Sequence, residues 1–242
     1  MANIKKALEI ARGFKGKWAS QEEILEIFRQ CDASWVHDGD PRKPHAELTS
    51  GFCSNGFFDC LRVLCYPRLS EALAEQLVMR LEKTIFCSDI DWVIGSPMAG
   101  ITFAYEVARL LGFTRLRAPE EVIAAFVEKD PSNPGKMLWR RMAIPEGEYV
   151  LQVEELTTTA KTLNEVERAV REGNPNPVNF LPVVGILVHR PPELVTMYGD
   201  RKIVAVVEKK IWAVSPEKCD LCKMGSPRYR PKIHWRELTG MG

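Results

Sequence analysis

The stretch YVLQVEELTTTAKT, residues 149–162, places two adjacent carboxylates and a hydroxyl-rich turn directly after an apolar segment. Residues 149–155 have the pattern of a buried strand, and residues 160–172 have the pattern of an amphipathic helix. At the carboxyl end of a parallel strand, the following turn and helix start present free backbone N–H groups and a positive dipole end. This pattern favours an anionic, hydroxyl-bearing ligand.

The residue types in the stretch fit a phosphorylated sugar. The threonines supply hydroxyls, and Ala160 is small where the backbone would approach a phosphate. Glu154 and Glu155 can accept hydrogen bonds from sugar hydroxyls beside that phosphate. The alternative is a capped helix with two solvated glutamates, because short phosphate-loop patterns recur by chance.

Outward from this stretch, strands alternate with helices from residue 91 onward, which predicts an α/β fold with a mostly parallel sheet and helices on both faces. We expect residues 1–68 to form N-terminal helices and a small hood, and residues 69–242 to form the core with a C-terminal extension, within one compact unit. The expected strands are 91–96, 121–129, 140–144, 149–155, 180–190 and 202–214. The expected helices are 3–12, 21–30 with a Ser20–Glu23 capping box, 69–86 capped by Ser70, 101–113 closed by Gly112, and 160–172.

The composition limits the possible functions. The chain of 242 residues has a formal net charge of +1, so no global field attracts nucleic acid or a membrane surface. It contains no apolar run of about 18 residues, and its N-terminal segment lacks the apolar region of a signal peptide. The odd count of seven cysteines favours reduced thiols. We therefore expect a cytoplasmic protein that binds neither membrane nor nucleic acid.

The stretch resembles the phosphoribosyl-diphosphate (PRPP) signature of the type I phosphoribosyltransferase family, which is an apolar strand, two acids, two apolar residues and a Thr-Thr-Gly-Gly-Thr loop. Residues 150–153 match the strand, with the polar Gln152 inside it. The two glutamates match the acids. Thr158, Thr159, Ala160 and Thr162 match the loop, whereas Thr157 and Lys161 replace an apolar residue and a glycine.

Other segments resemble the orotate branch of that family in the same order along the chain. DWVIGSPMAG, residues 91–100, is similar to the diphosphate loop. HAELTSGFCSNGFFDC, residues 45–60, resembles a Ser-Gly-x-x-Ser-x-x-aromatic segment, with Ser50, Gly51 and Ser54 in register. SPEKCDLCKMGSP, residues 215–227, is similar to a Cys-Pro-Leu-Cys ending, and residues 126–141 occupy the place of the mobile catalytic loop.

The resemblance implies a homodimeric enzyme that transfers the phosphoribosyl group of Mg²⁺-bound PRPP to a nucleobase, with orotate giving orotidine 5′-phosphate and diphosphate. It implies catalytic roles for Lys129, Lys136 and Glu155, and base binding by Phe57 and Phe58. The PRPP-binding residues that it implies are Ser96, Met98, Ala99, Gly100, Arg140, Glu154, Glu155, Thr157, Thr158, Thr159, Ala160 and Thr162.

Departures from the family pattern keep two alternatives open. Glu128 precedes Lys129 and the loop has no histidine, and Thr49 stands where one branch has a lysine that could pair with the carboxylate of orotate. A phosphoribosyltransferase for another base is therefore one alternative. A PRPP-sensing regulator without turnover is the other, although regulators of this kind generally need a basic nucleic-acid face.

Several residues also have purely structural interpretations. Phe57 and Phe58 could be core residues, and Arg140 and Arg141 could form an exposed loop edge with Trp139 instead of an anion clamp. Cys219-x-x-Cys222 supplies two metal ligands of four, so a structural or redox-inert pair is the favoured interpretation and no metal ligand is assigned.

Overall fold

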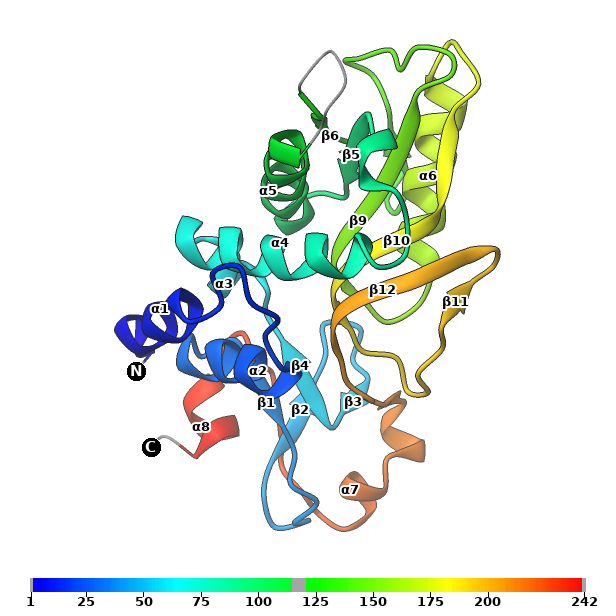
Figure 1. Cartoon of the computed structure of the whole chain (residues 1–242). Helices are drawn as coiled ribbons and strands as arrows, with labels where there is room; N and C mark the ends of the chain where they lie inside the picture. Colours follow the sequence, from blue (N-terminus) through cyan, green and yellow to red (C-terminus); the bar gives the residue numbers. More distant parts are fainter. Residues whose placement is uncertain (1, 115–120, 241–242) are drawn as a thin grey trace.

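The computed structural model describes residues 2–114 and 121–240. Its main sheet contains β5 (Trp92–Gly95), β6 (Ile123–Phe126), β9 (Tyr149–Thr157), β10 (Asn179–His189), β11 (Met197–Tyr198) and β12 (Arg201–Glu208). The strand order is β11-β12-β10-β9-β5-β6 (Figure 1). All neighbours pair in parallel except the short edge strand β11, which is antiparallel to β12. The expected mostly parallel sheet is confirmed.

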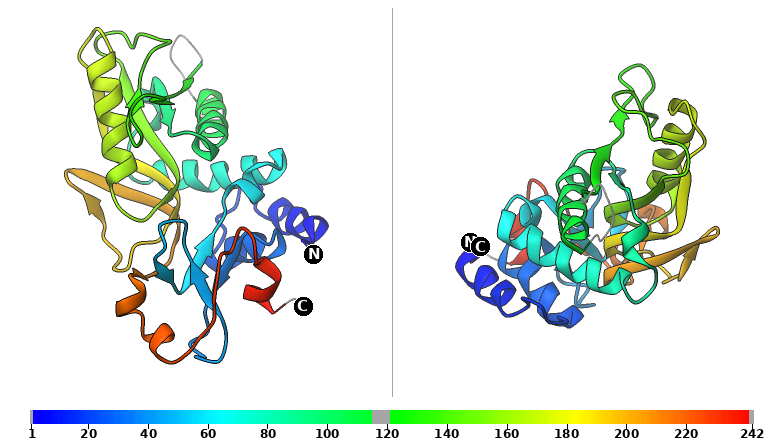
Figure 2. Two further views of the ribbon diagram at one scale, coloured as in Figure 1. Left: turned by 180° about the vertical axis from the view of Figure 1, so that it is seen from behind. Right: turned by 45° about the horizontal axis from the view of Figure 1, so that its top comes forward.

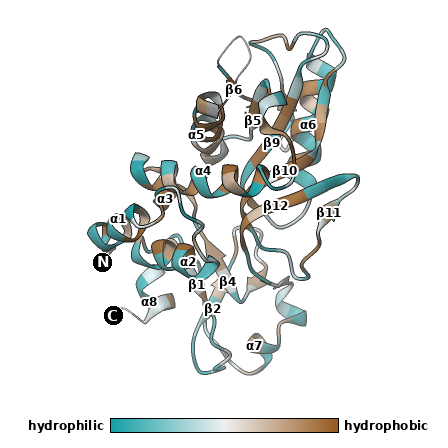
Figure 3. Cartoon of the chain, in the orientation of Figure 1, coloured by the Kyte–Doolittle hydropathy of each residue, from teal (hydrophilic) through white to brown (hydrophobic). Residues whose placement is uncertain are grey.

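Helices cover both faces of this sheet, as the continuous apolar strands require. On one face lie α4 (Pro67–Leu81) and α5 (Ala99–Thr114), and on the other lies α6 (Lys161–Gly173) (Figures 1 and 2). Successive side chains along each strand point to opposite faces of the sheet, so the sheet has one hydrophobic core on each face. Val93 and Leu151 pack in the core with α4 and α5, whereas Trp92 and Val150 pack in the core with α6. Apolar residues accordingly concentrate on β5, β9, β10 and α5 (Figure 3).

The N-terminal helices α1 (Ile4–Arg12), α2 (Gln21–Gln30) and α3 (Leu61–Leu64) extend the core on the α4 side. The expected capping box is confirmed, because Ser20 Oγ accepts from the Glu23 backbone N–H and the Glu23 carboxylate accepts from the Ser20 N–H. Among the helices that the structure describes, none combines the length and the apolar character needed to cross a membrane.

A second, small sheet joins the N-terminal third to the C-terminal segment. It contains β2 (His45–Glu47), β3 (Cys53–Ser54), β13 (Ala213–Val214) and β14 (Arg228–Tyr229), in the order β13-β3-β2-β14. Nearby are the ribbon of β1 (Ser34–Val36) with β4 (Gly56–Phe58), and two short helices, α7 (Asp220–Lys223) and α8 (Trp235–Thr239). The C-terminal segment thus returns to the hood residues, and the two ends of the chain lie near each other (Figure 2).

The boundaries of two helices, expected over residues 69–86 and 101–113, differ from the expectation. α4 begins at Pro67, with Tyr66 as its N-cap, and the expected cap Ser70 is buried inside the helix with its backbone N–H bonded to the Tyr66 carbonyl at 2.9 Å. Proline is favoured at a first helical position because it has no N–H to leave unpaired. α5 continues through Gly112 to Thr114, since that glycine does not adopt the left-handed conformation that ends helices.

One expected strand, residues 140–144, is also wrong. Ile144 is buried, but its backbone N–H donates to Asn174 Oδ1 at 2.7 Å and its carbonyl accepts from Asn174 Nδ2 at 2.9 Å. A side-chain amide therefore satisfies the backbone groups that a neighbouring strand would otherwise bind.

Candidate active site

The candidate site lies where β5, β9 and β10 end at the carboxyl edge of the main sheet. In open parallel sheets, ligands bind at this edge, because turns and helix starts converge there. The turn of residues 96–98 links β5 to α5, and the turn of residues 158–160 links β9 to α6. The peptide bond between Pro97 and Met98 is cis.

Glu154 is the buried member of the acid pair, with 1% of its surface exposed. Ser96 Oγ donates a hydrogen bond of 2.7 Å to its Oε2 atom. Its other oxygen, Oε1, is buried without a partner among the described residues. The carboxylate is thus fixed from one side and keeps an acceptor for a ligand on the other.

Glu155 extends to the start of α5. A Cβ atom added to Gly100 would lie 3.0 Å from Glu155 Oε2 and 3.2 Å from Ser96 Oγ, so a larger residue at this position would crowd both side chains. Gly95 allows the turn itself to close tightly, because its Cβ would lie 2.4 Å from the Gly100 carbonyl oxygen. Small residues at these positions therefore position the acid pair.

Burial sets the proton affinity of the two glutamates. Burial raises the pKa of Glu154 well above its usual range, and the nearby charge of Glu155 raises it further. Burial also raises the pKa of Glu155, while the positive charge of Lys129 acts in the opposite direction. A ligand that brings positive charge or hydroxyl donors to the pair would favour the ionised carboxylates.

The turn after β9 has the features expected of a phosphate site. Ala160 occupies the N-cap position of α6 and has no capping side chain of its own, while the Lys161 N–H donates to Thr159 Oγ1 at a long 3.5 Å. Thr157 is buried and its hydroxyl oxygen has no partner within residues 2–114 and 121–240. Thr158 and Thr162 are half-buried and Thr159 is exposed, so three hydroxyls border the start of this helix, where backbone N–H groups can bind an anion.

Gln152, the polar residue inside the signature strand, has a structural role. Its Nε2 donates to the Leu163 carbonyl at 3.1 Å, and its Oε1 accepts from Arg201 at 3.1 Å. Gln152 therefore ties β9 to α6 and to β12 and is not a ligand-binding residue.

Arg190, which belongs to no recognisable sequence motif, directly follows the last residue of β10. Its backbone N–H donates to the Thr157 carbonyl at 2.8 Å, which places it beside the end of β9. Burial lowers the pKa of its guanidinium, and its Nε atom is buried without a partner in the described part of the chain. Cys60 lies close to both Glu155 and Arg190. Its thiol contacts the Glu155 carbonyl at 3.2 Å and interacts electrostatically with the Arg190 guanidinium.

The catalytic-loop segment is a hairpin. β7 (Glu128–Lys129) pairs with β8 (Met137–Leu138) in antiparallel orientation, and residues 130–136 connect them. The hairpin base is tied to α6, because Glu165 accepts from the Met137 N–H at 2.8 Å. The strands form because both prolines and Gly135 lie in the connecting turn, where Gly135 has φ +87°.

The four cations of this segment occupy different environments. Lys129 is exposed and near enough to Glu155 to influence its pKa. Lys136 lies 4.0 Å from Glu165 on α6. Arg140 is exposed and interacts with Asp130, and Arg141 pairs with Glu128.

Trp139 is not part of an exposed loop edge. Its ring is buried against Trp92 in the core beneath α6, with the two ring centroids 6.3 Å apart. The buried Trp139 therefore anchors the end of the hairpin, and only the two arginines after it remain available at the surface.

The expected base-binding role of Phe58 needs correction. Phe58 is buried in the main core, where its ring contacts Phe28 edge-on at 5.7 Å, so it is not free to stack on a base. Phe57 alternates to the other side of β4 and packs against Trp235 at 6.3 Å, half-buried.

Unpaired buried polar atoms concentrate at this edge of the main sheet. In the described ranges, seven buried side-chain nitrogen or oxygen atoms lack a partner, and four of them belong to Glu154, Glu155, Thr157 and Arg190. Native proteins leave few such atoms unpaired, and those that remain commonly mark a ligand or catalytic site. The cluster combines acceptors, a hydroxyl and a cation.

Solved structures with a similar arrangement are phosphoribosyltransferases. An orotate phosphoribosyltransferase from Aeropyrum pernix matches with a TM-score of 0.51 and 16% identity, over 76% of this chain and 93% of its own. One from Mycobacterium tuberculosis matches with a TM-score of 0.50 and 19% identity, over 78% and 95%. The fold is therefore that of the type I phosphoribosyltransferases.

Sequence relatives define the family more closely. Orotate phosphoribosyltransferase of Pelotomaculum thermopropionicum is 35% identical over 213 residues, which are 88% of this chain and 97% of the relative. That of Thermoanaerobacter sp. is 34% identical, over 87% and 96%. No protein-family model matches the chain. The chain belongs to the orotate phosphoribosyltransferase family.

Proposed function

We propose that this protein transfers the phosphoribosyl group of PRPP to orotate, giving orotidine 5′-phosphate and diphosphate. The observation that carries the proposal is the cluster of unpaired buried atoms on Glu154, Glu155, Thr157 and Arg190. PRPP offers hydroxyls and phosphates to these acceptors and donors, and orotate offers a carboxylate and carbonyl oxygens.

The 5′-phosphate of PRPP binds at the turn of residues 157–162. Backbone N–H groups at the start of α6 and the threonine hydroxyls donate to the phosphate oxygens, and the small Ala160 permits close approach. The helix dipole contributes further, since its positive end faces the anion.

The ribose hydroxyls bind the two glutamates. An ionised carboxylate accepts hydrogen bonds, so Glu154 Oε1 and Glu155 Oε2 receive the partners that they lack in the protein. As the bond from C1′ to diphosphate breaks, the ribose becomes oxocarbenium-like, and the adjacent negative carboxylates favour that positive charge.

The diphosphate lies toward the turn of residues 96–100 and the hairpin cations Lys129, Lys136 and Arg140. The free carboxylate oxygens are of the type that Mg²⁺ or its water shell prefers, so the site fits a Mg²⁺ ion carried by PRPP. When bound, Mg²⁺ would neutralise charge on the departing diphosphate. The hairpin closes over the ligand and excludes water that would compete with the base.

Arg190 is the cation that recognises orotate. Its buried, partner-free Nε atom at the end of β10 can donate to the orotate carboxylate or a ring carbonyl. It supplies the positive charge that Thr49 does not. Phe57 remains the aromatic residue on the hood side, because Phe58 is occupied in the core.

The protein acts as a cytoplasmic homodimer in this proposal. None of the seven cysteines, all of which lie in the described ranges, forms a disulfide, as a reducing compartment favours. Size-exclusion chromatography with light scattering should give the mass of two chains, and a single-chain mass would contradict the dimer.

A binding assay decides the base. With a PRPP analogue and Mg²⁺ present, calorimetry should show that orotate binds more tightly than uracil, by about tenfold or more, since a charge-assisted hydrogen bond contributes about 1.5–3 kcal/mol. Preference for uracil, or binding of neither base, would remove orotate as the substrate. Protease sensitivity of residues 130–136 should fall with PRPP and Mg²⁺, and equal sensitivity would argue against closure.

A further inference from the structure

Four side chains with metal-binding atoms converge at the small sheet, outside the candidate active site. The ligand atoms of His45, Cys53, Cys219 and Cys222 all lie within 4.8 Å of one another. Cys222 Sγ lies 3.5 Å from Cys53 Sγ and 3.4 Å from His45 Nε2, and Cys219 Sγ lies 3.6 Å from His45 Nε2. The two ligands expected from Cys219-x-x-Cys222 are therefore joined by two more that lie far away in the sequence.

These separations match a tetrahedral site. With Zn–S distances of about 2.3 Å and Zn–N distances of about 2.0–2.1 Å, neighbouring ligand atoms of a tetrahedron lie about 3.5–3.8 Å apart. His45, Cys53 and Cys219 are buried, and Cys222 is half-buried. Four protein ligands leave no open position, which is typical of a structural site.

A hydrogen-bond chain orients the imidazole of His45. Ser226 Oγ lies 2.8 Å from His45 Nδ1 and 2.7 Å from the Lys43 carbonyl. The carbonyl can only accept, so the single hydroxyl proton is donated to it, and the Ser226 oxygen accepts from Nδ1–H. The lone pair of Nε2 therefore faces the thiols, which is the form that binds a metal, and Ser226 supplies the partner that ligating histidines usually have.

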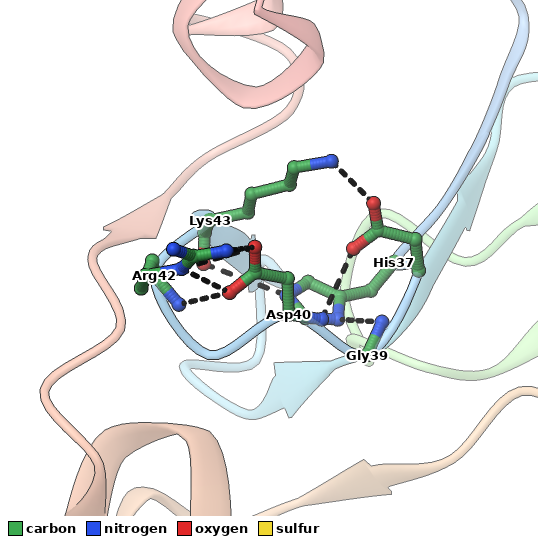
Figure 4. Close-up of polar contacts among 6 residues, drawn as sticks. His37, Gly39, Asp40, Arg42 and Lys43 are labelled. Atoms are coloured by element: carbon green, nitrogen blue, oxygen red, sulfur yellow. Dashed lines mark hydrogen bonds and ion pairs between the residues drawn. The ribbon is translucent and has the colours of Figure 1, made fainter.

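The loop before β2 fixes the Lys43 carbonyl. Asp40 pairs with Arg42 and Asp38 pairs with Lys43, while the backbone N–H of Gly39 donates to His37 Nδ1 at 2.9 Å (Figure 4). That bond leaves the proton of His37 on Nε2, which lies 3.5 Å from the Lys43 carbonyl. The loop thus supports the residues that orient the proposed ligand.

The small sheet buries few apolar side chains. Within the described ranges, the buried residues of its core cluster are Cys53, Cys219 and Leu221, with Trp212, Val214 and Cys222 packed against them. Small units with so few buried residues usually need a disulfide or a metal for stability. Here the four ligands would connect residues 45–53 to residues 219–222.

We propose that His45, Cys53, Cys219 and Cys222 bind one structural zinc ion that joins the C-terminal segment to the small sheet. Zinc displaces the protons of three thiols, so the site carries a charge of −1 with a neutral imidazole. Arg228 lies beside it, with Nη1 at 3.9 Å from Cys53 Sγ, and offsets that charge. Thiolate and imidazole ligands in a tetrahedron select zinc over Mg²⁺.

The metal content of the full-length protein tests the proposal independently of phosphoribosyl transfer. When it is purified from cells grown with added zinc, the protein should contain about one zinc ion per chain, as measured by inductively coupled plasma mass spectrometry. Exchange with Co²⁺ should give the visible bands of a tetrahedral thiolate complex. Absence of zinc together with absence of these cobalt bands would overturn the proposal.

Variants identify the ligands. Cys222→Ser, at the least buried ligand, should lose the zinc, and the matched control Cys65→Ser, at an exposed thiol, should keep it. Ser226→Ala preserves all four ligands and should weaken zinc affinity by about 10–100-fold in a chelator competition. Zinc retained at full stoichiometry by Cys222→Ser, or unchanged affinity in Ser226→Ala, would contradict this ligand arrangement.

Discussion

Ser96 Oγ donates a hydrogen bond of 2.7 Å to Glu154 Oε2 and so connects the turn after β5 to the end of β9. The bond holds one oxygen of a buried carboxylate, while Oε1 lacks a partner in the described part of the chain. A buried acceptor without a hydrogen-bond partner destabilises the folded protein. Glu154 Oε1 therefore lowers stability, but it is already in position to accept a hydrogen bond from a ligand.

The stability cost of Glu154 gives the first prediction. Burial raises the pKa of Glu154, so the folded chain holds its proton more tightly than the unfolded chain does. Stability is then lost as pH rises from the ordinary carboxyl pKa toward the raised value. Glu154→Gln should be more stable than the parent at neutral pH by about 1 kcal/mol, and the difference should shrink toward acidic pH.

Denaturant unfolding at several pH values measures this difference, and PRPP binding should weaken in the same variant. The matched control is Glu146→Gln, which removes an exposed carboxylate and should change neither property. Equal pH dependence of stability in Glu154→Gln and the parent would contradict the account.

Ala160 gives the second prediction. Its small side chain stands at the start of α6, where the 5′-phosphate is proposed to bind. Ala160→Leu should weaken PRPP binding by about tenfold or more, because losing charge-assisted hydrogen bonds costs about 1.5–3 kcal/mol each. Calorimetry measures the affinity, and the exposed Ala143→Leu serves as control. Unaltered affinity in Ala160→Leu would place the phosphate elsewhere.

Lys129 gives a prediction about pH. Burial raises the pKa of Glu155, and the positive charge of Lys129 opposes that rise. Lys129→Ala should therefore raise that pKa further and shift the acidic limb of the PRPP-binding profile to higher pH. Turnover should also fall, since a charge near the departing diphosphate is lost. The exposed Lys202→Ala is the control, and coincident pH profiles of the two variants would exclude the proposed role of Lys129.

Arg190 gives the fourth prediction, on base choice. Arg190→Gln should weaken orotate binding by about tenfold or more and leave uracil and PRPP affinity near the parent values. The exposed Arg12→Gln controls for the loss of a positive charge. If orotate affinity survives in Arg190→Gln, another group must bind its carboxylate.

Local sequence was sufficient for the features that depend on near neighbours. The Ser20–Glu23 capping box spans three residues, and the strand, acid pair and helix of residues 149–162 are contiguous. The alternation of strand and helix patterns from residue 91 onward predicted the parallel sheet, and the contiguous stretch of residues 149–162 placed the acids at its carboxyl edge.

Long-range packing decided the features that the sequence did not reveal. Nothing near Arg190 in the sequence indicates that it borders Thr157, and Phe58 became a core residue because Phe28 packs on it. The sequence favoured a metal-free interpretation of Cys219-x-x-Cys222 because the motif supplies only two ligands of four. His45 and Cys53 lie upstream and become neighbours only through the pairing of the small sheet.

The central claim is that the acid pair positions PRPP for transfer to orotate, and Glu155→Ala tests it most directly. The decrease of orotate absorbance should require both PRPP and Mg²⁺ in the parent protein, and it should be strongly reduced in Glu155→Ala at a nearly unchanged melting temperature. A parent protein that binds PRPP but consumes no orotate would contradict the enzyme assignment. Undiminished orotate consumption by a folded Glu155→Ala variant would contradict the role of the acid pair.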